Sequence, residues 1–172
     1  RANLCIKGGK IAAITDCGIP VTAAEETDAA GKYVLPGLID SHVHSRDGAC
    51  GAHHKEDFFH SSMAGACSGV TTILEMPNCN PAVYDVERLH ELIACITPKA
   101  HVDFGVWGLC LGELNNDQLQ PLADAGVVGF KFFWGYAIDA KSYQLIYNYT
   151  EGMENVIAPL DQGQVYKIFR EV

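Results

Sequence analysis

Short apolar segments alternate with segments of helical periodicity along most of this chain, and this alternation constrains the fold more than any other feature. The apolar segments predict one strand that ends at His44 and three more at residues 70–76, 102–111 and 127–134. Segments with helical spacing follow at residues 56–68, 85–96, 115–125 and 162–172. Near-continuously apolar strands that alternate with helices are typical of a parallel sheet covered by helices.

The length of this alternating part limits how the sheet can close. A closed (β/α)8 barrel, or TIM barrel, needs about 250 residues, and residues 36–172 offer about half of that length. We therefore predict an α/β fold in which residues 36–172 form the first four βα units of a barrel. This is the first half of a TIM barrel, truncated within its last helix.

The N-terminal segment has a different pattern. Residues 4–16 contain two short apolar stretches on either side of Gly8-Gly9, which predicts a β-hairpin. Small and polar residues follow before the first barrel strand begins. We expect residues 1–35 to be part of a small N-terminal β-domain of the β-sandwich type.

Composition excludes several classes of partner. A net charge of -9 argues against nucleic acid and against an anionic membrane surface. Apolar runs are shorter than the roughly 18 residues that span a bilayer. The first residues of the sequence do not resemble a signal peptide. The 7 cysteines form no CxxC pair, which favours reduced thiols in a cytoplasmic protein.

The sequence His42-Val43-His44 ends the first predicted barrel strand. Residues two apart in a strand point to the same face, so both imidazoles can chelate one metal ion. A buried strand has little other use for two histidines, and the pair therefore predicts a metal site.

Lys131 lies within the apolar fourth strand, where a lone charged amine is costly. Burial favours the neutral amine, which is nucleophilic and can take up carbon dioxide as a carbamate. That carbamate is a carboxylate able to bridge two metal ions. The alternative is a lysine that extends along the helix-facing side to solvent. Position alone favours this alternative, but His42 and His44 on the same barrel favour the ligand interpretation.

Residues 35–44 resemble the first barrel strand of the amidohydrolase superfamily. The chain resembles most closely its cyclic amidases: dihydroorotases, allantoinases and hydantoinases. The resemblance extends over nearly the whole chain in matching order and spacing. Its other motifs are residues 29–32, Gly69-Val70-Thr71-Thr72, Met76-Pro77-Asn78 and Gly129-Phe130-Lys131.

This resemblance implies a binuclear zinc site at the C-terminal mouth of the barrel. His42 and His44 would bind the more buried zinc ion, and Lys131, as a carbamate, would bridge both ions. The two ions would lower the pKa of a bound water, and the hydroxide formed from it would attack a ring amide. The family also uses two later histidines and an aspartate as general base, whereas no histidine follows Lys131. We therefore expect an N-terminal fragment of a longer enzyme, a homo-oligomer when full length.

Two residues predict the ring that is opened. In dihydroorotases an arginine and an asparagine at the positions of Arg46 and Asn78 bind the substrate carboxylate. The resemblance thus implies interconversion of dihydroorotate and carbamoyl-aspartate. A surface charge at Arg46 and a turn former at Asn78 are the alternatives.

Tyr136 favours another ring. In hydantoinases, a catalytic tyrosine five residues after the bridging lysine stabilises the tetrahedral intermediate, and Tyr136 has this spacing from Lys131. The alternative is an aromatic side chain packed at the strand's mouth. Ser45 and residues 47–52 also depart from the usual dihydroorotase pattern. An allantoinase or a hydantoinase (dihydropyrimidinase), acting on a small cyclic ureide or amide, is therefore the alternative enzyme. A non-catalytic scaffold relative, or an inactive fragment, is the alternative of another class.

Overall fold

The computed structural model describes residues 1–47, 54–79 and 82–172, in two compact units of residues 1–36 and 37–172. In the first unit, β1 (Asn3–Lys7) and β2 (Lys10–Thr15) pair in antiparallel fashion. The turn between them uses Gly8 and Gly9 at φ 59° and 72°, the left-handed values that a tight hairpin turn requires. The predicted hairpin is confirmed.

The second unit is built on parallel strands. One sheet has the order β3-β4-β5, and β6 pairs in parallel with β7. Backbone bonds continue the pairing between the two sheets, because Val128 N–H donates to the Val106 carbonyl. The strands are β3 (Leu38–Val43), β4 (Val70–Glu75), β5 (Asp103–Val106), β6 (Gly108–Leu109) and β7 (Phe130–Lys131).

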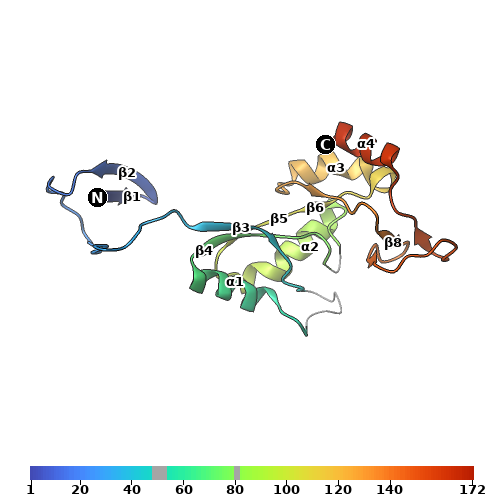
Figure 1. Ribbon diagram of the computed structural model, residues 1–172, viewed down its shortest axis with the longest axis horizontal. Coiled ribbons are helices and arrows are strands. Elements are labelled where there is room, and N and C mark those ends of the chain that lie inside the picture. The colour runs from blue at the N-terminus through green and yellow to red at the C-terminus, as the bar shows by residue number, and fades with distance from the viewer. Residues whose placement is uncertain (48–53, 80–81) are drawn as a thin grey trace. The chain divides into compact units, whose positions relative to one another are not determined.

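Four α-helices follow the strands in the alternating order that the sequence predicts. Asp57, Asp85 and Asp161 cap three of them by accepting a hydrogen bond from the backbone N–H three residues later. In Figure 1, α1 and α2 lie along one face of the β3-β4-β5 sheet. The helices are α1 (Phe58–Ser68), α2 (Val86–Ile96), α3 (Asn116–Asp124) and α4 (Gln162–Glu171), with 3-10 turns η1 (Thr97–Lys99) and η2 (Gly112–Leu114).

Two predicted strands were wrong in extent. The strand expected at residues 102–111 is interrupted at Trp107, and the strand expected at 127–134 shrinks to the two residues of β7. Between β7 and α4 the chain also forms an antiparallel sheet of order β10-β8-β9, for which the sequence pattern predicted no strands. Its strands are β8 (Ala137–Asp139), β9 (Leu145–Ile146) and β10 (Val156–Ile157).

The two faces of the parallel sheet differ in burial. The face toward α1 and α2 packs into the main hydrophobic cluster, which includes Phe58, Ile73 and Val106. The strand that carries the two histidines was expected to be buried, and this was wrong: Ile39 of β3 is 67% exposed and His42 is exposed. Among the described residues, β3 is an edge strand with a partner on one side only.

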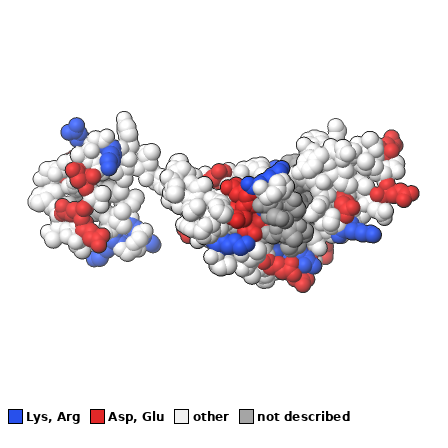
Figure 2. Space-filling view, turned by 90° about the horizontal axis from the view of Figure 1, so that it is seen from below, with Lys and Arg blue, Asp and Glu red and all other residues white. Residues whose placement is uncertain are grey.

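On the face in Figure 2, Lys and Arg side chains form small separate groups among Asp and Glu. Among the described residues, none of the helices combines the length and apolar character that crossing a membrane requires.

Candidate metal centre and substrate-binding residues

The two histidines of the first barrel strand converge. Nε2 of His42 lies 3.2 Å from Nε2 of His44, and the ring centroids are 5.1 Å apart. Two nitrogens bound to one tetrahedral zinc ion at about 2.0–2.1 Å are themselves about 3.3 Å apart. The pair therefore has the spacing of a chelate.

Alternation along the strand explains why the rings meet on the open face. Val43 packs against the helix-side cluster, so its neighbours His42 and His44 point the other way. The same reasoning places Lys131 on the open face, because Phe130 packs against the helix-side cluster. One face of the sheet thus carries all three proposed metal ligands.

The charge state of His44 suits a ligand. Burial, together with the charges of Arg46, His42 and Lys131, lowers the pKa of His44 to about 4. The imidazole is therefore neutral at physiological pH, which is the form that binds a metal.

Lys131 is held by its strand and by an aromatic ring. The backbone carbonyl of Lys131 accepts the N–H of Cys110 at 2.8 Å. Its Nζ lies 5.4 Å from the centroid of Phe133, within the range of a cation–π contact. Lys131 is only partly buried, so carbon dioxide can reach the amine.

A buried network that was not predicted from the sequence lies behind the proposed ligands. The Glu75 carboxylate accepts the Ser45 N–H at 3.0 Å and the Ser45 hydroxyl at 2.7 Å. Ser61 of α1 donates to the Ser45 hydroxyl at 2.7 Å. Burial raises the pKa of Glu75 to about 7, although the Ser45 donors oppose this shift. A carboxylate at the end of an apolar strand, directly before Met76-Pro77-Asn78, was the sequence signal for this site.

A second network fixes the residues just beyond Arg46. Asp47 accepts the backbone N–H of Phe58 at 2.9 Å, and Lys99 Nζ donates to it at 2.7 Å. Cys95 lies 3.6 Å from the same ammonium group. These contacts join the segment after β3 to the start of α1 and to the turn after α2.

The two proposed substrate-binding residues lie after neighbouring strands. Arg46 has φ 59°, a left-handed conformation that is uncommon outside glycine. Its charge lowers the pKa of both His44 and Glu75, so it belongs to the histidine site. Asn78 follows β4, and its Oδ1 is buried and accepts no hydrogen bond from the described residues. An unsatisfied buried acceptor is costly unless a ligand or water donates to it.

Tyr136 lies in a series of aromatic contacts rather than beside the histidines. Its ring is edge-on to Phe133 at 6.3 Å and to Tyr147 at 5.6 Å. Since Phe133 also contacts Lys131, the series leads from the lysine to the tyrosine. The side chain of Tyr136 is 41% exposed. Residues 48–52, part of the loop that departs from the dihydroorotase pattern, lie outside the described residues.

The donors fit part of a zinc site. In the described part of the chain, no group of three or more His, Cys, Asp or Glu side chains could hold a metal ion. His42 and His44 offer two imidazole nitrogens at chelating distance, and Lys131 offers a carboxylate only as a carbamate. This donor set suits zinc, but it needs further ligands.

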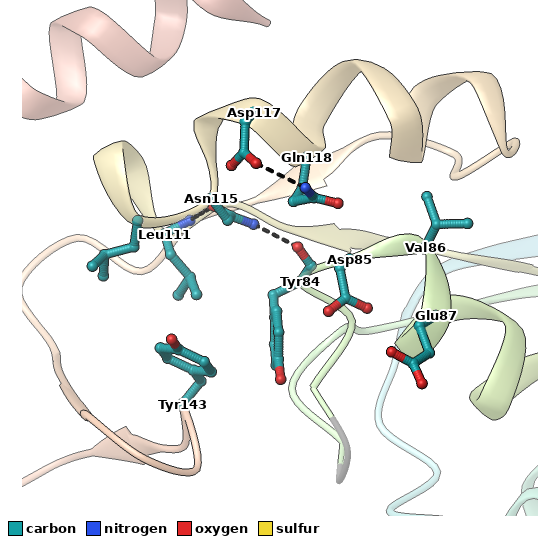
Figure 3. A pocket seen from close by; sticks show the side chains of 10 residues that line it. Tyr84, Asp85, Val86, Glu87, Leu111, Asn115, Asp117, Gln118 and Tyr143 are labelled. Carbon is teal, nitrogen blue, oxygen red and sulfur yellow. Dashed lines mark hydrogen bonds between the residues drawn. The ribbon is translucent and has the colours of Figure 1, made fainter.

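A cleft of about 400 Å³ lies away from these residues, between the N-terminal ends of α2 and α3 (Figure 3). Its polar groups serve the fold: the Asn115 amide donates to the Tyr84 and Leu109 carbonyls and accepts the Leu111 N–H. These hydrogen bonds hold together the segments around the cleft, and the cleft contains none of the proposed metal ligands. Its lining residues are Tyr84, Asp85, Val86, Glu87, Leu111, Leu114, Asn115, Asp117, Gln118 and Tyr143.

Parallel strands alternate with helices in this unit, and His42, His44 and Lys131 stand at or near the carboxyl ends of their strands, as in the first part of a (β/α) barrel. The family model for the amidohydrolase family matches residues 33–127, more than half of the chain. The chain belongs to the amidohydrolase family.

Similar proteins agree with this family and with the fold. An allantoinase of Deinococcus radiodurans is 41% identical over 138 residues, which cover 80% of this chain and 30% of the relative. A dihydroorotase of Listeria monocytogenes is 37% identical over 131 residues, 74% of this chain and 30% of the relative. The solved L-hydantoinase (dihydropyrimidinase) of Arthrobacter aurescens has a TM-score of 0.76 and 30% identity, covering 99% of this chain and 34% of its own.

These relatives confirm the predicted family, its cyclic-amidase group and the barrel fold. The chain spans about a third of the length of the relatives that it matches. The predicted preference for dihydroorotate is not singled out, because allantoinases, hydantoinases and dihydroorotases all occur among the relatives.

Proposed function

We propose that the full-length protein, the complete natural chain that contains residues 1–172, hydrolyses the ring amide of a small cyclic ureide or amide with the help of bound zinc. The observation that carries this proposal is the 3.2 Å approach of the His42 and His44 Nε2 atoms, on the face that also carries Lys131. Membership of the amidohydrolase family supports the same reaction class.

Each of the proposed site residues has a distinct role in this reaction. His42 and His44 would bind zinc through their Nε2 atoms. The Lys131 amine would add to the carbon of carbon dioxide and release a proton, and the resulting carbamate would supply a carboxylate ligand. When bound, zinc supplies a water of lowered pKa and polarises the amide carbonyl. The Tyr136 hydroxyl donates to the oxyanion as it develops.

Two observations bear on the ring. Identity of up to 41% to allantoinases favours the ring of allantoin. Arg46 acts electrostatically at the His44 site, and the buried Asn78 Oδ1 has no donor among the described residues. Arg46 favours a ring that bears a carboxylate, as in dihydroorotate, because a guanidinium binds a carboxylate through paired hydrogen bonds. The Asn78 Oδ1 is an acceptor and suits a donor such as a ring N–H.

The test compares three rings with one purified, zinc-loaded enzyme: allantoin, dihydroorotate and hydantoin. We expect ring opening of at least one, with allantoin favoured. Replacing Arg46 by alanine should lower kcat/KM for dihydroorotate by about tenfold more than for hydantoin, which has no carboxylate. Failure to open any of the rings would contradict the proposed reaction. An equal loss on both rings would contradict only the role of Arg46.

Metal content separates the enzyme from a scaffold relative. We expect two zinc ions per full-length chain by elemental analysis, and a carbamate signal by carbon NMR after exchange with labelled bicarbonate. Less than one zinc ion per chain rejects the binuclear site. A Lys131→Met variant that keeps the labelled signal shows that the carbamate lies on another residue.

A further inference from the structure

Trp107 connects the strands that carry the proposed ligands. It stands between β5 and β6, and its backbone N–H donates to the Glu75 carbonyl at 3.0 Å. Val106 belongs to the helix-side cluster, so alternation directs Trp107 to the open face. His42, His44 and Lys131 lie on that same face.

The indole of Trp107 reaches past β4 to the histidine strand. Its Nε1–H donates to the Ser41 carbonyl at 3.2 Å, directly before His42. The same point is a register shift: Asp40 pairs with Ile73, but Val43 pairs with Glu75. β3 therefore uses one residue more than β4 across this step. Such irregularities free backbone groups and re-aim side chains.

Side chains satisfy the backbone groups at this shift. The Asp40 carboxylate accepts the His42 N–H at 3.1 Å, and the Trp107 indole donates to the Ser41 carbonyl. The direction of the His42 ring depends on the peptide between these two groups. The indole is therefore a support for the conformation in which His42 and His44 converge.

The other edge of the indole rests on the lysine strand. A Cβ on Gly129 would lie 2.7 Å from Cζ3 of Trp107 and 3.2 Å from its Cε3. Glycine is thus required two residues before Lys131 because the ring occupies the space. One indole therefore lies against Ser41, directly before His42, and against Gly129, two residues before Lys131.

We propose that Trp107 is a positioning residue that sets the spacing between the histidine strand and the Lys131 strand, and thereby the affinity for zinc. This inference rests on the proposed function, because it assumes that these residues bind zinc. The indole acts through the Ser41 carbonyl and Gly129, and it touches no reacting atom.

The test measures zinc affinity of the full-length protein by competition with a chelator, followed by elemental analysis. Trp107→Phe keeps an aromatic ring but removes the donor, and Gly129→Ala displaces the ring from the opposite strand. We expect each to lower zinc affinity by about tenfold, as is usual for residues that support metal ligands. Trp134→Phe is the matched control, since Trp134 is 57% exposed, and it should keep wild-type affinity.

Two further readouts separate positioning from general damage to the fold. Thermal unfolding of metal-free Trp107→Phe should stay near wild type, whereas the visible spectrum of its cobalt-substituted form should change. Wild-type zinc affinity in both Trp107→Phe and Gly129→Ala overturns the inference. If Trp107→Phe does not fold, Gly129→Ala decides alone. A wild-type protein that binds no zinc instead rejects the proposed function.

Discussion

The two faces of the parallel sheet are built by different rules. On the helix side, Phe58, Ile73 and Val106 are 0%, 2% and 4% exposed and form one apolar cluster. On the open face, His42 is exposed, and its direction depends on the hydrogen bond that Asp40 accepts from its N–H and on the one that Trp107 donates to Ser41, both near the register shift. Apolar burial is non-directional, whereas a hydrogen bond fixes an angle. The helix side therefore supplies stability, and the open face supplies geometry.

The largest expected effect falls on the open face. Replacing His44 by alanine in the full-length protein should lower kcat by more than about 1000-fold, which is more than about 4 kcal/mol of transition-state stabilisation. The reason is the loss of one of two converging imidazoles. Unfolding free energy of the metal-free protein should change little, because His44 lies outside the apolar cluster. Steady-state kinetics and denaturant unfolding measure the two effects. If the variant did not fold, the open face would also be needed for stability, and the proposed difference between the faces would be wrong.

The next effect falls on the helix side and has the opposite signature. Phe58→Ala should lower the unfolding free energy by about 4 kcal/mol, because it empties a fully buried ring site at the start of α1. The neighbouring Phe59→Ala is the control, since Phe59 is 42% exposed and should cost much less. Urea unfolding measures both. Zinc content per folded molecule should stay at the wild-type value, and a drop would show that the faces are coupled.

Glu75 lies in the buried network behind the proposed ligands and should make stability depend on pH. Burial raises its pKa from 4.5 to about 7, so the folded state binds more protons than the unfolded state between these values. Stability therefore falls as pH rises from about 4.5 to about 7, by about 3 kcal/mol at 1.36 kcal/mol per pKa unit. In Glu75→Gln this contribution is absent. Unfolding free energies across this range should diverge between the two proteins, and parallel curves contradict the assignment.

Sequence periodicity predicted the order of the elements because local signals and packing agree there. Asp57, Asp85 and Asp161 mark helix starts by their own side-chain hydrogen bonds. The strand expected at residues 127–134 failed because strand length depends on pairing, and only Phe130–Lys131 pair regularly with β6. The sheet of β8, β9 and β10 escaped prediction because strands of two or three residues show no clear period.

The candidate site likewise has a part that local sequence patterns predict and a part that depends on contacts between distant segments. The spacing of His42 and His44 was visible because chelation on one strand is a local pattern. Ser45 and Glu75, or Trp107 and Ser41, join distant parts of the chain, and their contacts exist only after folding. Lys131 needed both kinds of information, since its position alone also fits a lysine that extends to solvent.

The smallest effect concerns the ion pair that fixes the segment after Arg46. Lys99 donates to Asp47 at 2.7 Å, and the side chains are 35% and 8% exposed. Lys99→Met should cost about 1 kcal/mol, because water screens the lysine while Asp47 keeps the Phe58 N–H. Lys167→Met is the matched control, since the Lys167–Glu113 pair is 66% and 69% exposed, and it should leave urea unfolding unchanged. Asp47 belongs to the helix-side support, so zinc affinity of Lys99→Met should equal wild type. A loss of zinc in this variant would extend the positioning of the ligands from the open face to the network behind it.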